Sequence, residues 1–348
     1  MEPNPASGVL LHAVGGLAAA SFYIPYTRVR NWQWESYWLV GGIFSWLIAP
    51  LIGVAILAPS GFDALLNAPG GAIFRTYLFG LLWGIGGLTF GLSVRYLGLS
   101  LGYAVALGFC AAFGTVIPPL FLGTFMDLIV TSSGLTTLFG VIVCLAGIAV
   151  CGRAGIRRER EVDLGKKEEG AVEFNLIHGL WVAVFAGVMS ACMAFAFAAG
   201  KPISDAALAS GVSPTFVNLP VLIVSLGGGL TTNLVWCIYL NVRNQSYRDY
   251  GNAGDAPILW NYLFSAIAGC TWYLQFFFYG MATTMMGAYD FSSWTIHMAF
   301  IIAFSNAWGL LFGEWKGTQR PTRVTLATGI AVLVLSTIVV GVGNYLAG

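Results

Sequence analysis

The chain has 348 residues, of which 57% are hydrophobic and only 31 are charged, 16 being Lys or Arg and 15 Asp or Glu. A soluble protein of this length needs many more charged side chains to cover its surface, so a soluble globular fold is excluded. The formal net charge is +1, and no basic stripe with interleaved aromatic residues occurs. This pattern argues against a nucleic-acid partner.

Apolar segments recur along the whole chain. A membrane-spanning helix requires about 20 predominantly apolar residues. We expect ten such helices, at about residues 7–26, 36–58, 73–95, 99–122, 135–153, 176–199, 214–240, 258–282, 290–313 and 323–346. Only Glu2 carries charge before the first segment, which therefore lacks the basic start of a cleaved signal peptide and is interpreted as a retained helix. The expected fold is an all-α polytopic membrane protein.

The basic residues predict an orientation for these helices. All but two Lys and Arg residues lie in segments that follow the first, third, fifth, seventh and ninth helices, and the two exceptions are Arg75 and Lys201. Because Lys and Arg are enriched in cytoplasmic segments, this pattern places both termini outside the cytoplasm. The six cysteines lie in or at the ends of these helices without metal-ligand or redox spacing, so we interpret them as packing residues.

A charged segment divides the ten helices into two sets of five. We expect a first five-helix repeat at 1–153, a charged cytoplasmic linker at 154–175 and a second five-helix repeat at 176–348. Because five is odd, the second repeat must be inverted relative to the first. A weak similarity between residues 88–105 and 274–291, which aligns Tyr103 with Tyr289, supports this division. Inverted repeats are typical of transporters, whose site lies near the midplane where the repeats meet.

Ionisable side chains at 290–297 mark the ninth helix as a functional candidate. At 100° per residue, Trp294 lies about 40° and His297 about 20° from Asp290 around the helix, so the three share one stripe. An ionisable group in the bilayer costs roughly 2.5–3.5 kcal/mol unless it faces a cavity or a partner. Two structural alternatives remain open: Asp290 at the membrane interface as an N-terminal helix residue, and His297 as a packing residue.

The eighth helix presents Trp272, Gln275 and Tyr279 on one face. Aromatic rings stack on the C–H faces of a sugar, while amide and hydroxyl groups bond its oxygens. Packing alone is the alternative, although a buried amide without partners is costly. In the first helix, His12, Tyr23 and Tyr26 share one face, and in the third helix Trp83 and Thr89 could reach a cavity. Asn218, Pro220 and the glycine run 227–229 predict a bent or broken seventh helix, for packing or for gating.

No enzyme signature emerges from the chain. Nucleotide-binding, zinc-ligand and nucleophile-elbow patterns are missing from the sequence, and glycine pairs such as those in WGIGG at 83–87 lie within an expected membrane span. We therefore expect no enzymatic activity, metal or cofactor. A carrier without an ATP-binding motif must use an ion gradient or run downhill.

Several segments resemble the bacterial L-rhamnose–proton symporter family, a ten-helix branch of the drug/metabolite transporter superfamily. They are SFYIPYTRVRNWQWESYW at 21–38, LWGIGGLTFGLSVRYLG at 82–98, AAGKPI at 198–203, WYLQFFFY at 272–279 and YDFSSWTIHMAF at 289–300. The resemblance covers essentially the whole chain in the same order. It implies proton-coupled import of a 6-deoxyhexose across the bacterial inner membrane, and the family name implies L-rhamnose.

The chain departs from the family pattern at one block of the third helix. It has Gly87, Thr89 and Phe90 where that pattern has two asparagines and a tyrosine. The loss of these polar groups leaves L-fucose or another related sugar open as the substrate.

We therefore expect a monomeric symporter in contact with membrane lipids, which binds a small sugar and uses protons as the coupling ion by alternating access. The expected sugar-binding residues are Tyr23, Trp83, Gln275, Tyr279 and Trp294, and the expected proton-coupling residues are Asp290 and His297. The alternatives are a facilitator without proton coupling, a drug or metabolite exporter, and a membrane-embedded enzyme or sensor.

Overall fold

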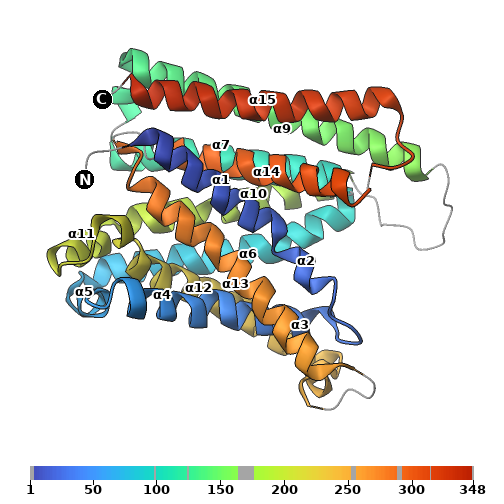
Figure 1. Cartoon of the computed structure of the whole chain (residues 1–348), viewed down its shortest axis with the longest axis horizontal. Coiled ribbons are helices and arrows are strands. Elements are labelled where there is room, and N and C mark those ends of the chain that lie inside the picture. Colours follow the sequence, from blue (N-terminus) through green and yellow to red (C-terminus); the bar gives the residue numbers. More distant parts are fainter. Residues whose placement is uncertain are drawn as a thin grey trace. The chain divides into compact units, whose positions relative to one another are not determined.

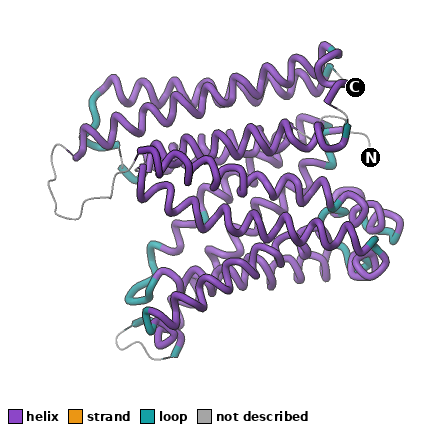
Figure 2. The backbone as a smooth tube through the Cα atoms, turned by 180° about the vertical axis from the view of Figure 1, so that it is seen from behind, coloured by secondary structure: helices purple, strands orange, loops and turns teal. Residues whose placement is uncertain are grey.

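The computed structural model describes residues 4–97, 99–123, 125–163, 176–251, 256–287, 292–313 and 315–346. Within these residues the regular structure is helical, without a strand (Figure 2). The expectation of an all-α protein is confirmed. Eight helical segments of the described chain are long and apolar enough to cross a membrane, as an integral membrane protein requires.

The chain divides into two compact units, each built from segments of both sequence halves. Unit 1 comprises Met1–Leu17, Gly86–Ala194 and Ala282–Gly348, and unit 2 comprises Ala18–Ile85 and Phe195–Met281. The boundaries between the units fall inside four long helices, which are α1 (Pro5–Ser21), α6 (Gly70–Leu97), α10 (Leu176–Ala199) and α13 (Ile258–Thr283).

Unit 1 also contains α7 (Leu99–Leu122), α8 (Phe125–Val130), α9 (Ser132–Asp163), α14 (Ser293–Leu311) and α15 (Arg320–Tyr345). α9 and α15 lie side by side over most of their length (Figure 1). α14 packs against α7, α9 and α15. This packing places α14, which carries Trp294 and His297, among three neighbouring helices of the unit.

Unit 2 contains α2 (Tyr23–Tyr26), α3 (Trp34–Ile43), the π-helical turn η1 (Phe44–Ile48), α4 (Ala49–Leu57), α5 (Gly61–Asn67), α11 (Lys201–Ala209), the 3₁₀ turn η2 (Pro214–Phe216), α12 (Leu219–Arg243) and the 3₁₀ turn η3 (Ser246–Tyr250). α12 packs along α3, η1 and α4 and also contacts α5 and α11. The interruption between α1 and α2 precedes Pro25, which has no N–H to continue the helix.

The glycine run 227–229 does not break its helix. α12 is continuous from Leu219 to Arg243. A Cβ atom added to Gly228 would lie 2.2 Å from the carbonyl oxygen of Tyr77 on α6. The glycine therefore serves close approach of α6 and α12, a packing role that the sequence pattern did not separate from a break.

Eight segments rather than ten meet the length and hydropathy requirements for a membrane span in the described part of the chain. The expected spans at 99–122 and 258–282 correspond to α7 and α13, which have 24 and 26 residues. α13 is rich in Trp and Tyr, which lower its mean hydropathy although their rings are largely apolar. In the described part of α7, the apolar segment is Val105–Gly114, which is too short to cross a membrane by itself.

The expected linker begins as helix. α9 continues to Asp163, and residues 164–175 lie outside the described residues. The Glu161 carboxylate accepts hydrogen bonds from the Gln319 backbone N–H at 2.8 Å and from the Thr322 hydroxyl at 2.6 Å. The last turns of α9 are therefore connected to the start of α15.

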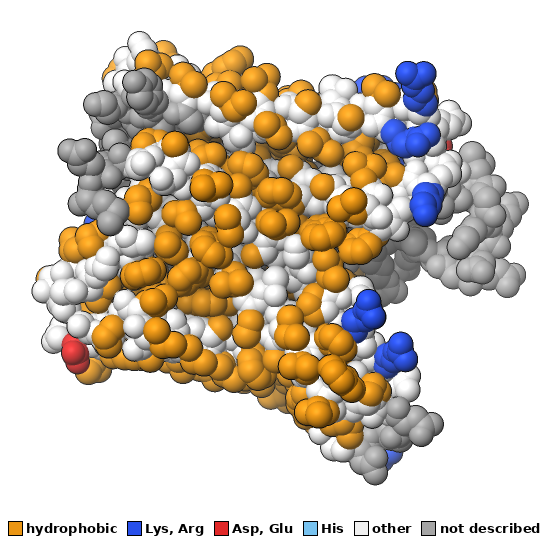
Figure 3. Space-filling model, viewed as in Figure 1, with side chains coloured by type: hydrophobic (Ala, Val, Ile, Leu, Met, Phe, Trp, Pro, Cys, Tyr) orange, Lys and Arg blue, Asp and Glu red, His pale blue; other side chains and the backbone are white. Residues whose placement is uncertain are grey.

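Large apolar side chains cover the outer faces of the helices. Trp181 on α10 is 74% exposed and Leu259 on α13 is 78% exposed. On the face drawn in Figure 3, hydrophobic side chains cover most of the surface, and the Lys and Arg side chains of unit 1 lie near one end of α9 and α15. Such large apolar surfaces with charge at helix ends are typical of lipid-facing helices.

Candidate functional site

Two helices of unit 2 approach each other closely enough for backbone contact. A Cβ atom on Gly269 of α13 would lie 2.1 Å from the carbonyl oxygen of Gly41 on α3, a distance that no side chain tolerates. Glycine at both positions lets the helix backbones touch. The larger side chains one turn away on each helix are thereby brought together around a common space.

Those larger side chains form an aromatic cluster around Trp272. The centroid of its indole ring lies 3.9 Å from that of Phe22, 5.3 Å from that of Trp38 and 6.4 Å from that of Trp46. All three contacts are edge-to-face, a favoured geometry for aromatic rings. Trp46 extends the cluster to Trp83, at 6.1 Å between centroids.

A small cavity of about 10 Å³, which is room for roughly one water-sized group, lies within this cluster. It is lined by Tyr26, Trp38, Gly41, Gly42, Ser45, Trp46, Gly269 and Trp272, all from unit 2. Aromatic surfaces dominate the lining, and its polar side-chain atoms belong to uncharged groups. This chemistry suits a neutral ligand that has both apolar faces and polar groups, as a sugar has.

Four of the five expected sugar-binding residues belong to unit 2, and two of them contact the aromatic cluster. Trp83 is buried and meets Trp46 and Phe276 edge to face, at 6.1 and 5.3 Å between centroids. Tyr23 is 47% exposed and contacts Phe22 of the cluster at 5.9 Å between centroids. Gln275 is buried three residues after Trp272 on α13.

Tyr279 lies in a different environment. Its ring is buried and packs against Phe197 at 4.9 Å between centroids. The next residue, Gly280, accepts a hydrogen bond at 2.8 Å from the side-chain amide of Asn218. Tyr279 is therefore packed against Phe197 of α10 beside the segment that begins α12.

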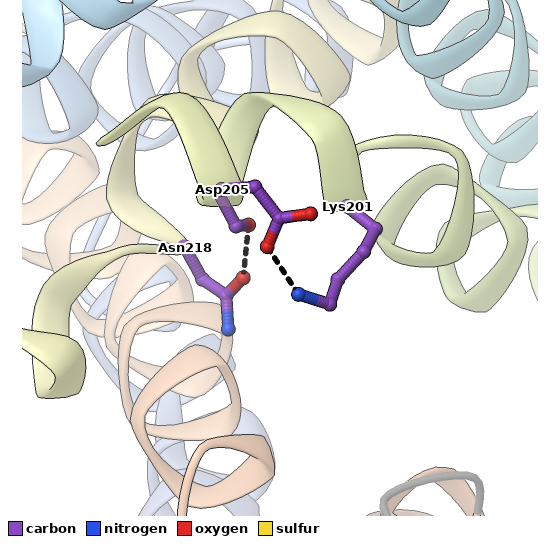
Figure 4. A network of polar contacts seen from close by, with 4 residues as sticks. Lys201, Asp205 and Asn218 are labelled. Carbon is purple, nitrogen blue, oxygen red and sulfur yellow. Dashed lines mark hydrogen bonds and ion pairs between the residues drawn. The ribbon is translucent and has the colours of Figure 1, made fainter. Parts of the chain in front are cut away.

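Asn218 also connects α11 to this region. Its side-chain oxygen accepts a hydrogen bond from the Ser204 hydroxyl at 2.8 Å, and Lys201 and Asp205 form an ion pair on the same short helix (Figure 4). The side chains of Lys201 and Asp205 are 72% and 58% exposed. This ion pair is therefore a surface contact of small energetic weight, about 0–1 kcal/mol.

Trp294, the fifth expected sugar-binding residue, belongs to unit 1. It is 2% exposed, and its indole N–H donates to the carbonyl oxygen of Cys110 on α7 at 3.1 Å. The hydrogen bond fixes the ring between α7 and α14. Because this N–H already has an acceptor, it is less available to a sugar, and the bond itself helps to hold α14 against α7.

His297 lies one turn further along α14 and faces a second histidine. Its ring centroid is 5.8 Å from that of His12 on α1, with an interplanar angle of 60°, and both side chains are fully buried. His12 was not among the expected coupling residues, although its position on an apolar helix is the same kind of signal that singled out His297. Asp290, the other expected coupling residue, lies outside the described residues.

Sequence reasoning also missed a buried polar cluster at one end of unit 2. The Glu35 carboxylate accepts hydrogen bonds from the Ser246 hydroxyl at 2.6 Å and the Asn244 amide at 2.9 Å. The Asp249 carboxylate accepts from the Ser36 hydroxyl at 2.7 Å and the Gln33 N–H at 2.8 Å. These bonds hold the start of α3 to η3 and the end of α12, and this partnering fits a structural role.

Two further observations bear on the chemistry of the site. At Gly87, where the chain departs from the family pattern, an added Cβ would meet no atom within 4 Å, so a larger side chain has room there.

Among the described residues, no group of three or more His, Cys, Asp or Glu side chains could hold a metal ion.

Comparison with known proteins identifies relatives along nearly the whole chain. The family model for the L-rhamnose-proton symport protein matches residues 1–346. The L-rhamnose-proton symporter of Cronobacter sakazakii is 41% identical over 339 residues, and those of Shigella sonnei and Klebsiella pneumoniae are 40% and 39% identical over the same length. In each pair the match covers 97% of both chains.

Proposed function

The chain belongs to the L-rhamnose-proton symport protein family, and from that membership we propose that it imports L-rhamnose together with protons. The observation that carries the proposal is the match over 97% of both chains to relatives that are named for this activity. A family of symporters implies a transporter rather than an enzyme. The eight apolar helices of the described chain fit that role.

The sugar is bound in this proposal by aromatic rings and uncharged polar groups. The residues that supply them are Tyr23, Trp83, Gln275, Tyr279 and Trp294. The aromatic cluster around Trp272 supports the choice of Trp83 and Tyr23, because Trp83 contacts Trp46 and Tyr23 contacts Phe22. Its faces suit the C–H surfaces of a 6-deoxyhexose.

The proton is carried by Asp290 and His297 in this proposal. Histidine changes charge near neutral pH, and a carboxyl group can be brought into the same range by its surroundings. If the protonated site binds sugar more tightly, then bound sugar must also strengthen proton binding by the same factor. This reciprocity couples the two fluxes without a cofactor, and the proton gradient supplies the energy.

For the architecture, we propose ten membrane-spanning helices in two inverted sets of five, with alternating access of one site to the two sides of the membrane. α13 supports the larger number, because its 26 residues reach about 39 Å at 1.5 Å per residue. Its exposed apolar residues, Leu259, Leu263, Ile267 and Leu274, recur at helical spacing. The protein acts as a monomer among the lipids of the bacterial inner membrane, with both termini in the periplasm.

The test is uptake of labelled L-rhamnose and L-fucose into proteoliposomes, with and without an inward proton gradient, by the wild type and Asp290→Asn. We expect gradient-driven accumulation of L-rhamnose by the wild type and only equilibration by the variant. With one proton per sugar, accumulation reaches about tenfold for each pH unit.

Other outcomes change the proposal in defined ways. Accumulation of L-fucose alone would keep the symporter and replace the sugar. Wild-type uptake that never exceeds equilibration would identify a facilitator. Accumulation retained by Asp290→Asn would move the proton site away from Asp290.

A further inference from the structure

Three hydrogen-bond donors line the cavity in unit 2 without an acceptor. The Ser45 hydroxyl and the indole N–H groups of Trp46 and Trp272 are buried atoms with no hydrogen-bond partner among the described residues. All three residues line the same cavity, and Ser45 and Trp46 are 2% and 3% exposed. Buried donors are nearly always paired in folded proteins, so three unpaired donors at one cavity indicate that an acceptor is brought from outside.

The backbone that carries two of these donors is unusual as well. Ser45 and Trp46 lie in η1, a π-helical turn in which the N–H of Ala49 bonds to the carbonyl oxygen of Phe44. The next residue, Pro50, has no N–H and cannot donate to Trp46, so the regular α-helical pattern is interrupted there. Single π-helical turns inside α-helices occur frequently at functional sites.

The chemistry of the cavity defines what it can bind. An indole N–H only donates, so the ligand must present oxygen acceptors to Trp46 and Trp272. None of the described side chains that line the cavity is charged, so the cavity favours a neutral group. The space left between the rings accepts a group about the size of one water, and a single sugar hydroxyl fits it without displacement of a ring.

From these observations we propose that Ser45, Trp46 and Trp272 form a subsite for one hydroxyl group of the transported sugar. The inference rests on the proposed function and adds to it a set of donors of which the sequence pattern singled out only Trp272. Trp38 and Tyr26 also line the cavity. The subsite distinguishes between sugars by the presence and direction of one hydroxyl, because an analogue without it leaves the donors unpaired.

The experiment measures equilibrium binding of labelled L-rhamnose to the purified full chain, in competition with analogues that each lack a single hydroxyl group. Ser45→Ala and Trp272→Phe remove one donor each. Ser225→Ala and Trp260→Phe are the matched controls in unit 2: Ser225 is buried away from the cavity and its hydroxyl bonds within α12, and Trp260 is an exposed residue of α13. Thermal unfolding of each variant verifies that it is folded.

We expect Ser45→Ala and Trp272→Phe to bind L-rhamnose about three- to tenfold more weakly than wild type, with the controls unchanged. The analogue that lacks the hydroxyl bound at this subsite should bind the wild type weakly. The Ser45→Ala substitution should weaken its binding little further, because the interaction that the substitution removes is already missing from that analogue. Unchanged binding by both variants would overturn the subsite and leave the cavity to a buried water. Failure of the wild type itself to bind L-rhamnose would refute the proposed function instead.

Discussion

At the scale of single residues, the histidine pair is the arrangement whose chemistry bears most directly on coupling. His12 and His297 come from helices far apart in the sequence, yet their buried rings face each other at 5.8 Å between centroids. The same stretch of α14 is bonded to two other helices: the Trp294 indole N–H donates to the Cys110 carbonyl oxygen on α7, and the Cys144 thiol on α9 donates to the Thr295 carbonyl oxygen at 3.9 Å. Histidine changes charge near neutral pH, so two facing imidazoles are candidates for holding the coupled proton.

We predict that His12→Gln and His297→Gln each abolish proton-driven accumulation of sugar. Sugar exchange across the membrane, which needs no net proton movement, should stay within about threefold of wild type because the aromatic cluster of unit 2 is unchanged. The measurement compares gradient-driven uptake with counterflow in proteoliposomes. His178→Gln, which alters the exposed third histidine, is the control and should behave as wild type. Accumulation retained by both variants would exclude the pair from coupling.

At the scale of helices, close packing through glycine determines which side chains meet. Adjacent glycines of α12 differ sharply in their surroundings: an added Cβ at Gly227 would meet nothing within 4 Å, whereas at Gly228 it would lie 2.2 Å from the Tyr77 carbonyl oxygen. The obstacle at Gly228 is backbone, so it cannot rotate away. One substitution should therefore have opposite effects at the two positions.

We predict that Gly228→Ala lowers the free energy of unfolding by about 1–3 kcal/mol, as overpacking does. Gly227→Ala should raise it by about 0.5–1 kcal/mol, because alanine has the higher helix propensity and meets no obstacle. The measurement compares the melting temperatures of the two purified variants in the same detergent. Equal melting temperatures would mean that α6 and α12 do not pack as closely as described.

A second prediction at this scale concerns the contact between α9 and α15. Hydrogen bonds from the Thr322 hydroxyl and the Gln319 N–H hold the pKa of the Glu161 carboxyl below its usual value of 4.5. A lowered pKa means that the carboxylate stabilises the folded protein above the ordinary pKa and that this contribution disappears as the pH falls through the folded-state pKa.

Glu161→Gln should therefore melt at a slightly lower temperature than wild type near pH 7. The difference should shrink as the pH falls below 4.5, when wild-type Glu161 becomes protonated. Thermal unfolding across this pH range provides the measurement. Because Glu161 lies at the surface, we expect the effect at neutral pH to be small and to weaken with added salt.

At the scale of the whole molecule, the distribution of Lys and Arg predicts which ends of the helices face the cytoplasm. Lys201 precedes α12 and Arg248 follows it, so a single spanning helix separates the two positions. Five of the six cysteines are buried, and Cys270 is exposed. A Cys270→Ser background therefore removes the main source of unwanted labelling.

In that background we predict that Lys201→Cys reacts with a membrane-impermeant thiol reagent added outside intact cells. Arg248→Cys should react only after the membrane has been opened. Both positions have exposed side chains, so accessibility reports the side of the membrane rather than burial. The reverse pattern would invert the proposed topology and place both termini in the cytoplasm.

Composition and periodicity were sufficient to predict the fold class and most of the helices. Long apolar segments have few folded forms open to them in a bilayer, since every backbone polar group must be bonded internally. The whole-chain resemblance to a symporter family, confirmed by the family model and the relatives, was likewise a property of the linear sequence. The contacts of individual site residues were harder to predict, as the packing of Tyr279 against Phe197 illustrates, because they depend on segments that are far apart in the sequence.

The sequence by itself determined the membrane environment, the helical segments and the family, because these depend on local composition and on residue order. Only the tertiary structure decided that His12 faces His297 and that Ser45, Trp46 and Trp272 share one cavity. These groupings join helices that are far apart in the chain. They depend on how closely the backbones approach at positions such as Gly41 and Gly269, and a linear pattern contains no measure of that distance.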